Sequence, residues 1–577
     1  MKKEYSSYET MDKTLHAAMS KLTSGLSPSA LMAAYTDWAV HLASSPGKQA
    51  HLLEKSARKS ARLASYLTNC TAKKGLNDAC IEPLPFDKRF IDLAWKKWPF
   101  NLLHQSFLLN QQWWSNATTG VDGVTQQHEN VMEFATRQLL DVFSPSNYLL
   151  TNPQLIDQTK KEGGQNLVRG MHNLIDDMQR TIGNKKPAGT EEYTVGKNLA
   201  VTPGKVVYRN RLIELIQYEP VTEEVRPEPI LIVPAWIMKY YILDLSAKNS
   251  LVKYLTEQGF TVFMVSWKNP DEDDRDLGMA DYRQLGVMDA INTIGKITGK
   301  SKVHSMGYCL GGTLLSIAAA AMSRDGDDRI QSVSLLATQV DFSEAGELML
   351  FINESQVSFL EDMMWEQGYL DAKQMSGAFQ LLNSNDLIWS RMVHDYLMGE
   401  RTPINDLMAW NFDTTRMPYK MHSQYLRKLF LDNDLTEGRY LVNEKPISIS
   451  DIRAPAFVVG TQKDHVAPWH SVYKFHLLSD TDVTFLLTSG GHNAGIVSEI
   501  GHPRRSYQIA TTKKEDKYTD PNSWEAKYAH HDGSWWPELT KWLHSHSSQF
   551  TAPPSMGAPK KKLSVLGDAP GTYILQD

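Results

Sequence analysis

The pattern of apolar and polar positions changes character near residue 190. Before it, apolar residues recur at three- and four-residue spacing, as in 52–67 and 130–143, which is typical of amphipathic helices. After it, short apolar runs alternate with helical stretches, which is typical of a mostly parallel sheet covered by helices. The sequence therefore predicts an N-terminal helical domain over 1–190 and an α/β domain over 191–577.

Several apolar runs of the second region predict buried strands, at 229–234, 260–267, 330–336, 454–460 and 482–487. Helices are expected at 249–258, 282–298 and 536–546. The alternation pauses between about 341 and 450, where Met, Trp, Phe and Asn are frequent and the spacing is helical. We expect this insertion to form a cap over a functional site. The Pro- and Lys-rich tail from 551 is expected to be extended or loosely docked.

A Gly-x-Cys-x-Gly-Gly motif, Gly307-Tyr308-Cys309-Leu310-Gly311-Gly312, lies between a β-prone segment at 301–306 and an Ala-, Leu- and Ile-rich helical segment at 313–322. A nucleophile elbow has this form, with Cys309 where most α/β-hydrolases have serine. The glycines permit a strained turn and close passage of helix past strand, and a helix N-terminus favours a thiolate. The motif predicts an α/β-hydrolase fold and acyl transfer through a thioester on Cys309.

An elbow nucleophile needs a base and an orienting acid, which follow it in that fold in the order nucleophile, acid, base. Asp464 comes after the strand at 454–460, and His492 comes after the strand at 482–487. Loops after parallel strands open at one sheet edge, so these side chains are expected to converge on Cys309. His492 would accept the thiol proton, and Asp464 would orient His492 or help to deprotonate an attacking alcohol. His465 is the competing base, but it directly follows the acid and is expected to point away.

The oxyanion formed during acyl transfer needs backbone donors. One is expected from the N–H of Leu310, the residue after the nucleophile. The second is expected from the loop after the strand at 229–234, at Trp236 or Ile237.

Composition narrows the classes of protein. The 577 residues are 42% hydrophobic and 22% charged, with a net charge of −6, which is ordinary for a globular protein and argues against a nucleic-acid partner. Three cysteines are too few for a disulfide framework, which fits a cytoplasmic setting. The start has no apolar signal segment and no apolar run approaches the ~20 residues of a membrane span.

No cofactor or metal site is predicted. The adjacent His530, His531 and Asp532 lack the one-face spacing of a helix-borne zinc site and are expected in a solvated turn. His304, on the segment that leads into the elbow, is expected to be a core histidine with satisfied hydrogen bonds.

Six further motifs lie along the chain in addition to the cysteine motif. They are Ser144-Pro145-Ser146-Asn147, Thr202-Pro203-Gly204-Lys205, Ser266-Trp267-Lys268-Asn269-Pro270, Asp464-His465-Val466-Ala467-Pro468-Trp469, Gly491-His492 and Gly533-Ser534-Trp535-Trp536-Pro537. Through these motifs and their order, the chain resembles the polyhydroxyalkanoate synthases of class I. The resemblance runs from about residue 86 to the C-terminus.

The resemblance implies an acyltransferase that moves an (R)-3-hydroxyacyl group from coenzyme A to Cys309 and extends a polyester (poly-3-hydroxybutyrate in the best-known case) with release of CoA. It also implies a homodimer on the surface of cytoplasmic polymer granules. From the motifs alone, a cysteine-dependent α/β-hydrolase or acyl-CoA thioesterase remains the enzymatic alternative. A granule-coating scaffold protein is the non-enzymatic alternative.

The chain departs from the usual class I pattern at two loops and reads as a divergent branch. Ala235 and Met238 stand in a loop that is usually Pro-Pro-x-Ile-Asn-Lys, which bears on the oxyanion hole and on substrate preference. After the base, Asn493-Ala494-Gly495-Ile496 replaces the less polar Ile-Ala-Gly-Val. Acyl chain length cannot be read from these residues.

Overall fold

The computed structural model describes residues 6–23, 25–72, 79–84, 87–371, 374 and 388–576, without the side chains of 69–72. The chain forms two compact units. The first, here called the sheet unit, comprises Met1–Gly25, Thr190–Ser376 and Ile404–Asp577. The second, here called the helical unit, comprises Leu26–Gly189 and Gly377–Pro403.

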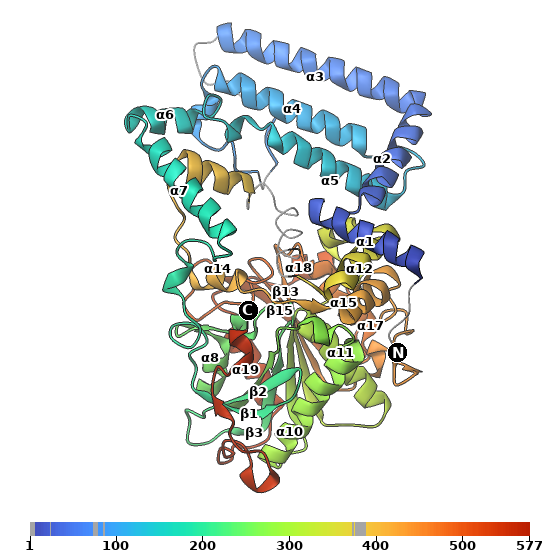
Figure 1. The fold of residues 1–577 in the computed structure, drawn as a ribbon, viewed down its shortest axis with the longest axis vertical. Helices are drawn as coiled ribbons and strands as arrows, with labels where there is room; N and C mark the ends of the chain where they lie inside the picture. The colour runs from blue at the N-terminus through green and yellow to red at the C-terminus, as the bar shows by residue number, and fades with distance from the viewer. Residues whose placement is uncertain are drawn as a thin grey trace. The chain divides into compact units, whose positions relative to one another are not determined.

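A single large sheet organises the sheet unit (Figure 1). Its strands lie in the order β16-β15-β14-β13-β8-β7-β3-β6-β2-β1-β17. The central ones run parallel from β6 to β14, and antiparallel strands flank them on both sides. The bounds are β1 Gly204–Arg209, β2 Ile213–Tyr218, β3 Arg226–Val233, β6 Phe260–Trp267, β7 Val303–Tyr308, β8 Ile330–Leu336, β13 Ala456–Thr461, β14 Val483–Thr488, β15 Ser506–Thr512, β16 His531–Asp532 and β17 Gly567–Asp568.

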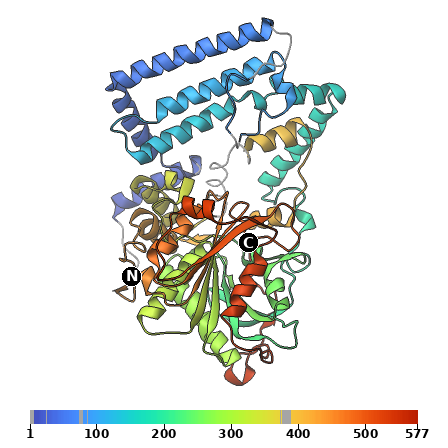
Figure 2. The same ribbon diagram turned by 180° about the vertical axis from the view of Figure 1, so that it is seen from behind.

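Successive side chains of these strands point to opposite faces of the sheet and contribute to two hydrophobic cores, one on each face. Leu231 and Val233 of β3 join the core under α10 (Asp289–Thr298) and α11 (Leu310–Arg324). Ile230 and Ile232 join the core under α8 (Leu251–Glu257) and α19 (Trp536–Ser545). Figure 1 and Figure 2 show these helices covering the sheet from opposite sides. The predicted parallel sheet with helices on both faces is therefore confirmed.

Most predicted elements lie where the pattern placed them, because buried parallel strands are rich in apolar residues. The strands at 260–267 and 330–336 are β6 and β8 at the same bounds. The elbow strand is β7, which extends to Tyr308, two residues beyond the predicted end. The helix expected at 282–298 is a π-helix over Tyr282–Met288 that continues as α10.

The predicted insertion at 341–450 carries helices and short strands, with 372–373 and 375–387 outside the described residues. Its described elements are η7 Gly346–Phe351, α12 Glu354–Gln367, β9 Tyr369–Leu370, η9 Met392–Leu397, α14 Asp406–Asn411, β10 Met417–Pro418, α15 Tyr419–Tyr425, η10 Leu426–Leu431, β11 Leu441–Val442 and β12 Lys445–Pro446. The first helix of the chain, α1 (Ser7–Leu22), packs on α12. His16 Nδ1 lies 2.8 Å from Asp362 of α12, and Lys13 pairs with the same carboxylate.

The C-terminal tail is docked through specific bonds, in contrast to the extended or loose tail expected. Glu214 of β2, whose side chain is fully buried, accepts hydrogen bonds from the backbone N–H groups of Thr572 and Tyr573 at 2.8 and 2.9 Å. Tyr573 in turn donates to the carbonyl of Asn210 at 2.6 Å. A buried carboxylate that needs donors explains why this tail is held.

The described part of the helical unit is built from α-helices, short 3₁₀ turns and the π-helix η9. The helix predicted at 52–67 lies within α3, and the one predicted at 130–143 is part of α5, which ends one residue earlier, at Val142. Ser27 and Asn152 cap α2 and α6, each followed by proline at the first helical position. The bounds are α2 Pro28–Ala43, α3 Pro46–Ala72, η1 Leu93–Lys96, α4 Phe100–Thr118, α5 Gln126–Val142, η2 Pro145–Asn147, α6 Pro153–Lys161 and α7 Gln165–Ile182. No described helix combines the length and the apolar composition that crossing a bilayer requires.

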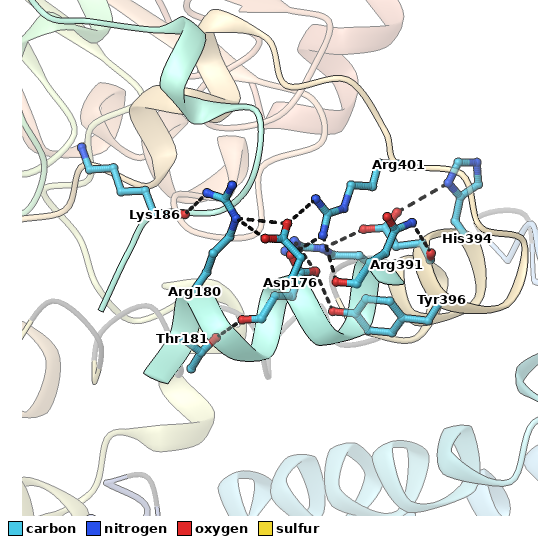
Figure 3. Close-up of polar contacts among 11 residues, drawn as sticks. Asp176, Arg180, Thr181, Lys186, Arg391, His394, Tyr396 and Arg401 are labelled. Carbon is cyan, nitrogen blue, oxygen red and sulfur yellow. Dashed lines mark hydrogen bonds and ion pairs between the residues drawn. The ribbon is translucent and has the colours of Figure 1, made fainter. Parts of the chain in front are cut away.

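The two units differ from the domains expected on either side of residue 190 by two segments. Residues 1–25 join the sheet unit because α1 packs on α12, and 377–403 join the helical unit. Within the helical unit, Arg401 donates to Asp176 of α7 (Figure 3) and to Asp177 of the same helix, each over 2.8 Å. Tyr396 also donates to Asp177, at 2.9 Å, and burial together with that carboxylate raises the pKa of Tyr396 to about 12.

Close backbone contact supports these ion pairs. A Cβ added to Gly170 of α7 would lie 1.8 Å from the carbonyl oxygen of Tyr396, and one added to Gly399 would lie 2.3 Å from that of Asn166. Only glycine permits α7 and the segment around η9 to approach this closely.

We predict that Gly170→Ala loosens the contact between α7 and residues 388–403. The added methyl group forces the two backbones apart, at a cost of about 1–3 kcal/mol in the free energy of unfolding. Limited proteolysis should show faster cleavage within 388–403, and thermal unfolding should begin earlier. Gly47→Ala is the matched control, because nothing lies within 4 Å of a Cβ at that position. Equal behaviour of the two variants would contradict the prediction.

Candidate active site

Cys309 stands at a strained turn between β7 and α11. Its φ is 52° and its ψ is −126°, a conformation that costs a non-glycine residue of the order of 1–3 kcal/mol. The strand and the helix hold it there, because the Cys309 N–H donates to Leu336 at 2.9 Å and the Cys309 carbonyl accepts from Gly312 at 2.9 Å. Thr338 adds a side-chain hydrogen bond to the same carbonyl, at 3.2 Å.

The three glycines of the motif are required by space. A Cβ at Gly307 would lie 2.3 Å from Cα of Gly312, and one at Gly311 would lie 2.1 Å from the carbonyl oxygen of Val233. At Gly312 it would meet Thr338 Oγ1 at 1.9 Å. Helix α11 therefore passes against β3 and β7 at backbone distance, as an elbow requires.

Asp464 is a fully buried carboxylate surrounded by donors. Its Oδ1 accepts from the N–H groups of Val466 and Ala467, at 2.8 and 2.7 Å. Its Oδ2 accepts from Thr461 Oγ1 and from His492 Nδ1, both at 2.8 Å. A carboxylate can only accept, so Nδ1 of His492 carries a proton and Nε2 is the nitrogen left for the nucleophile.

The charges of this pair shift both pKa values. Burial alone would raise the pKa of Asp464, but the attraction of His492 and the four hydrogen bonds hold it below its usual range. Burial alone would lower the pKa of His492, but the negative charge of Asp464, with electrostatic and hydrogen-bond contributions from Cys309, holds it well above its usual range. The site therefore stabilises an imidazolium between the carboxylate and the sulfur.

Aromatic side chains surround the part-buried Cys309. The ring of Tyr308 lies 5.6 Å from that of His492. Burial raises the pKa of Tyr308 far above its usual range, and Cys309 and Asp464 add to that effect. Burial and Cys309 likewise raise the pKa of Tyr425, from α15 of the insertion. Tyr425 packs with Phe342 and Phe430, and Cys309 packs against the same hydrophobic core, so the insertion contributes apolar surface to the core that borders Cys309.

Two tryptophans fix the loop that carries His492. Trp535 Nε1 donates to the carbonyl of Gly495 at 3.0 Å, and Trp536 Nε1 donates to that of Ile496 at 3.1 Å. Both indoles are buried. The Gly-Ser-Trp-Trp-Pro motif therefore acts as a support for the base loop.

The loop after β3 lies at the elbow, since Gly311 abuts Val233 and Pro234. The carbonyls of Trp236 and Ile237 are occupied by Thr415, which donates from Oγ1 at 2.5 Å and from its N–H at 3.1 Å. Among the described residues no acceptor is recorded for the N–H groups of Trp236 and Ile237. The N–H of Leu310 belongs to the first turn of α11, where helical bonds leave donors unused. These three donors remain candidates for the oxyanion hole.

His465 is exposed, as expected. His531 and Asp532 are also exposed, but they form the edge strand β16, paired with β15, and not the turn that was predicted. His304 is buried, with Ser332 Oγ at 2.7 Å and Ser547 Oγ at 3.0 Å from its two ring nitrogens. Burial lowers its pKa to about 4, as a neutral core histidine requires.

Several residues of the site escaped the sequence reasoning. Thr461, Thr338 and Thr415 each support a predicted residue through a hydroxyl, and a lone threonine gives no signal of this. Asn493 was visible as a departure from the related synthases, and it contacts Tyr308, the residue before the nucleophile.

We predict that Asp464→Asn slows alkylation of Cys309 by iodoacetamide by about 10- to 100-fold at neutral pH. Without the carboxylate the pKa of His492 falls, the imidazolium is lost at lower pH and the thiolate loses its partner. Initial rates between pH 5 and 9, with peptide mapping to separate Cys70 and Cys80, measure this. Asp480→Asn, at an exposed carboxylate, is the control. A native pH profile in Asp464→Asn would show that this pair does not activate the cysteine.

Comparison with known proteins agrees with this geometry. Residues 86–255 match the family described as "Poly-beta-hydroxybutyrate polymerase (PhaC) N-terminus", 6–48 match "Poly-beta-hydroxybutyrate polymerase N terminal" and 228–498 match the alpha/beta hydrolase fold. The chain is 40% identical to a poly(3-hydroxyalkanoate) polymerase of Methylorubrum extorquens, over 89% of this chain and 84% of that protein.

Two further relatives carry similar names. The poly(3-hydroxyalkanoate) polymerase subunit PhaC of Rhizobium etli is 37% identical over 86% of this chain and 78% of its own length. The subunit of the same name from Cupriavidus necator is 33% identical over 85% and 83%. By these similarities, which span nearly the whole chain, it belongs to the poly(3-hydroxyalkanoate) polymerase family.

Proposed function

We propose that this chain polymerises (R)-3-hydroxyacyl-CoA into a polyester through an acyl thioester on Cys309. The observation that carries the proposal is a cysteine at the elbow, beside the His492–Asp464 pair, in a chain 40% identical to a poly(3-hydroxyalkanoate) polymerase. The enzyme is an acyltransferase.

In the first half-reaction the Cys309 thiol passes its proton to Nε2 of His492 and attacks the thioester carbonyl of the substrate. The oxyanion would be held by the N–H of Leu310 and by that of Trp236 or Ile237; a single such donor is typically worth about 100- to 1000-fold in rate. The carbon–sulfur bond to CoA breaks, and CoA leaves as the thiol with the proton from the imidazolium. The acyl group is then bound to Cys309.

In the second half-reaction the 3-hydroxyl of another unit, or of a chain end, attacks this acyl thioester. His492, oriented by Asp464, accepts the hydroxyl proton and returns it to the Cys309 sulfur as the ester forms. Direct help from Asp464 in deprotonating the alcohol is the alternative route. Each cycle makes one ester and releases one CoA.

The acceptor decides between a synthase and a thioesterase with the same residues. Water as acceptor gives free hydroxy acid, whereas a hydroxyacyl acceptor gives polymer. The aromatic side chains Tyr425, Phe342 and Phe430 of the insertion belong to the hydrophobic core against which Cys309 packs, and this apolar surface favours an apolar acceptor over water. A homodimer at the surface of cytoplasmic polymer granules is part of the same proposal, since the product is insoluble.

The purified protein given (R)-3-hydroxybutyryl-CoA should release CoA and form insoluble polymer. CoA is measured with a thiol reagent, polymer by turbidity and by analysis of the pelleted ester. Release of CoA and free 3-hydroxybutyrate in equal amounts, without polymer, would instead identify a thioesterase. Absence of any CoA release would favour a scaffold protein.

Cys309→Ala should lower CoA release by at least about 1000-fold, because the covalent intermediate cannot form. Cys309→Ser should also be severely impaired, since a hydroxyl is a poorer nucleophile than a thiolate without stronger activation. Cys80→Ala is the control, at a cysteine of the helical unit. Circular dichroism should show an unchanged fold in all three variants. Substantial activity in Cys309→Ala would assign the nucleophile elsewhere.

A further inference from the structure

The residue after the base makes two side-chain hydrogen bonds that tie different parts of the sheet unit together. Asn493 Oδ1 accepts from the hydroxyl of Tyr308 at 2.6 Å. Asn493 Nδ2 donates to Asn411 Oδ1 at 3.2 Å. Tyr308 ends β7 immediately before the nucleophile, and Asn411 ends α14 of the insertion.

Tyr308 and the helix that ends at Asn411 both contact residues of the proposed site. The Tyr308 ring contacts that of His492, so the Tyr308–Asn493 bond closes a ring of contacts through the base. On the other side, Trp410 of α14 donates from Nε1 to the carbonyl of Lys239 at 2.8 Å. Lys239 continues the loop that carries Trp236 and Ile237. Helix α14 therefore bonds to both the base loop and the loop proposed for the oxyanion hole.

We propose that Asn493 is a positioning residue that sets the orientation of His492 by tying its loop to the nucleophile strand through Tyr308 and to α14 through Asn411. This inference rests on the proposed roles of Cys309 and His492. Tyr308 is buried, and a buried hydroxyl needs an acceptor, which Asn493 supplies. An apolar residue at 493 could make neither bond.

A defined change in pH behaviour follows. Asp464 and Cys309 are the titratable groups that raise the pKa of His492, and the ring of Tyr308 packs beside it. Cys309 also raises the pKa of Tyr425, which comes from α15. If the loop loses its tether, His492 is held less firmly between Asp464 and the sulfur, and the imidazolium–thiolate pair is weakened. The pH midpoint for alkylation of Cys309 therefore rises.

The test is the rate of iodoacetamide modification of Cys309 against pH. We expect Asn493→Leu, which keeps side-chain shape, to move the midpoint upward by roughly half to one pH unit, because one hydrogen bond corresponds to a shift of that size. The rate at pH 7 should fall about three- to tenfold. Asn292→Leu is the matched control. Asn292 is an exposed residue of α10, away from the site, and its Oδ1 accepts a hydrogen bond from Arg329.

A double variant separates positioning from stability. Asn493→Leu alone leaves the Tyr308 hydroxyl buried without an acceptor, whereas Asn493→Leu with Tyr308→Phe removes both groups. We expect the double variant to regain thermal stability and to keep the raised midpoint. Return of the midpoint to its native value, or an unchanged midpoint in Asn493→Leu, would overturn the proposal. Asn411→Ala should shift the midpoint in the same direction, and no shift there would overturn the link to α14.

The alkylation assay uses no substrate, so its outcome does not depend on polymer synthesis. Native protein that forms no polymer would refute the proposed function while the Asn493 profile could still be measured. Polymer synthesis with a native profile in Asn493→Leu would refute only the positioning role.

Discussion

The close passage of α11 across β3 and β7 is the constraint on which the site depends. The three glycines at 307, 311 and 312 leave no room for a side chain, and the helix therefore starts directly at the sheet edge. That geometry forces Cys309 into a conformation with positive φ. The strain is offset by backbone bonds to Leu336 and Gly312 and by the two hydrophobic cores on either side. The sulfur is placed by sterics before any charge acts on it.

The charge of His492 then interacts with the sulfur of Cys309. Asp464 is buried but accepts four hydrogen bonds, which keeps it ionised where burial alone would favour the neutral acid. One of the four donors is His492, so the same carboxylate fixes the tautomer and raises the pKa of the base. A site arranged in this way depends on its loops keeping their places. The bonds from Trp535, Trp536 and Thr415 to those loops serve that purpose.

The sequence predicted what local pattern determines. β6 is mostly apolar and β8 alternates apolar residues with small or amide side chains before a Leu-Leu end, so their bounds could be predicted from the sequence. The elbow and the residues proposed as acid and base were predicted from their positions after parallel strands, and the structure brings Asp464 and His492 together. Contacts that depend on tertiary packing left no such pattern. Glu214 reads as an ordinary strand carboxylate, and only the fold shows that the C-terminal tail supplies its donors.

The division into units shows most clearly what a linear reading omits. The polar stretch after α7 predicts one boundary at 190, whereas the chain passes between the units at 25, 189, 376 and 403. The first helix supplies cations to Asp362 of the insertion, and α7 supplies carboxylates to Arg401 within the same insertion. A piece beginning at 190 would keep the elbow, the acid and the base but would leave both partners unpaired. The insertion at 341–450 is therefore divided between the two units, with Asp362 paired inside the sheet unit and Arg401 paired inside the helical unit, and its sequence alone does not reveal this division.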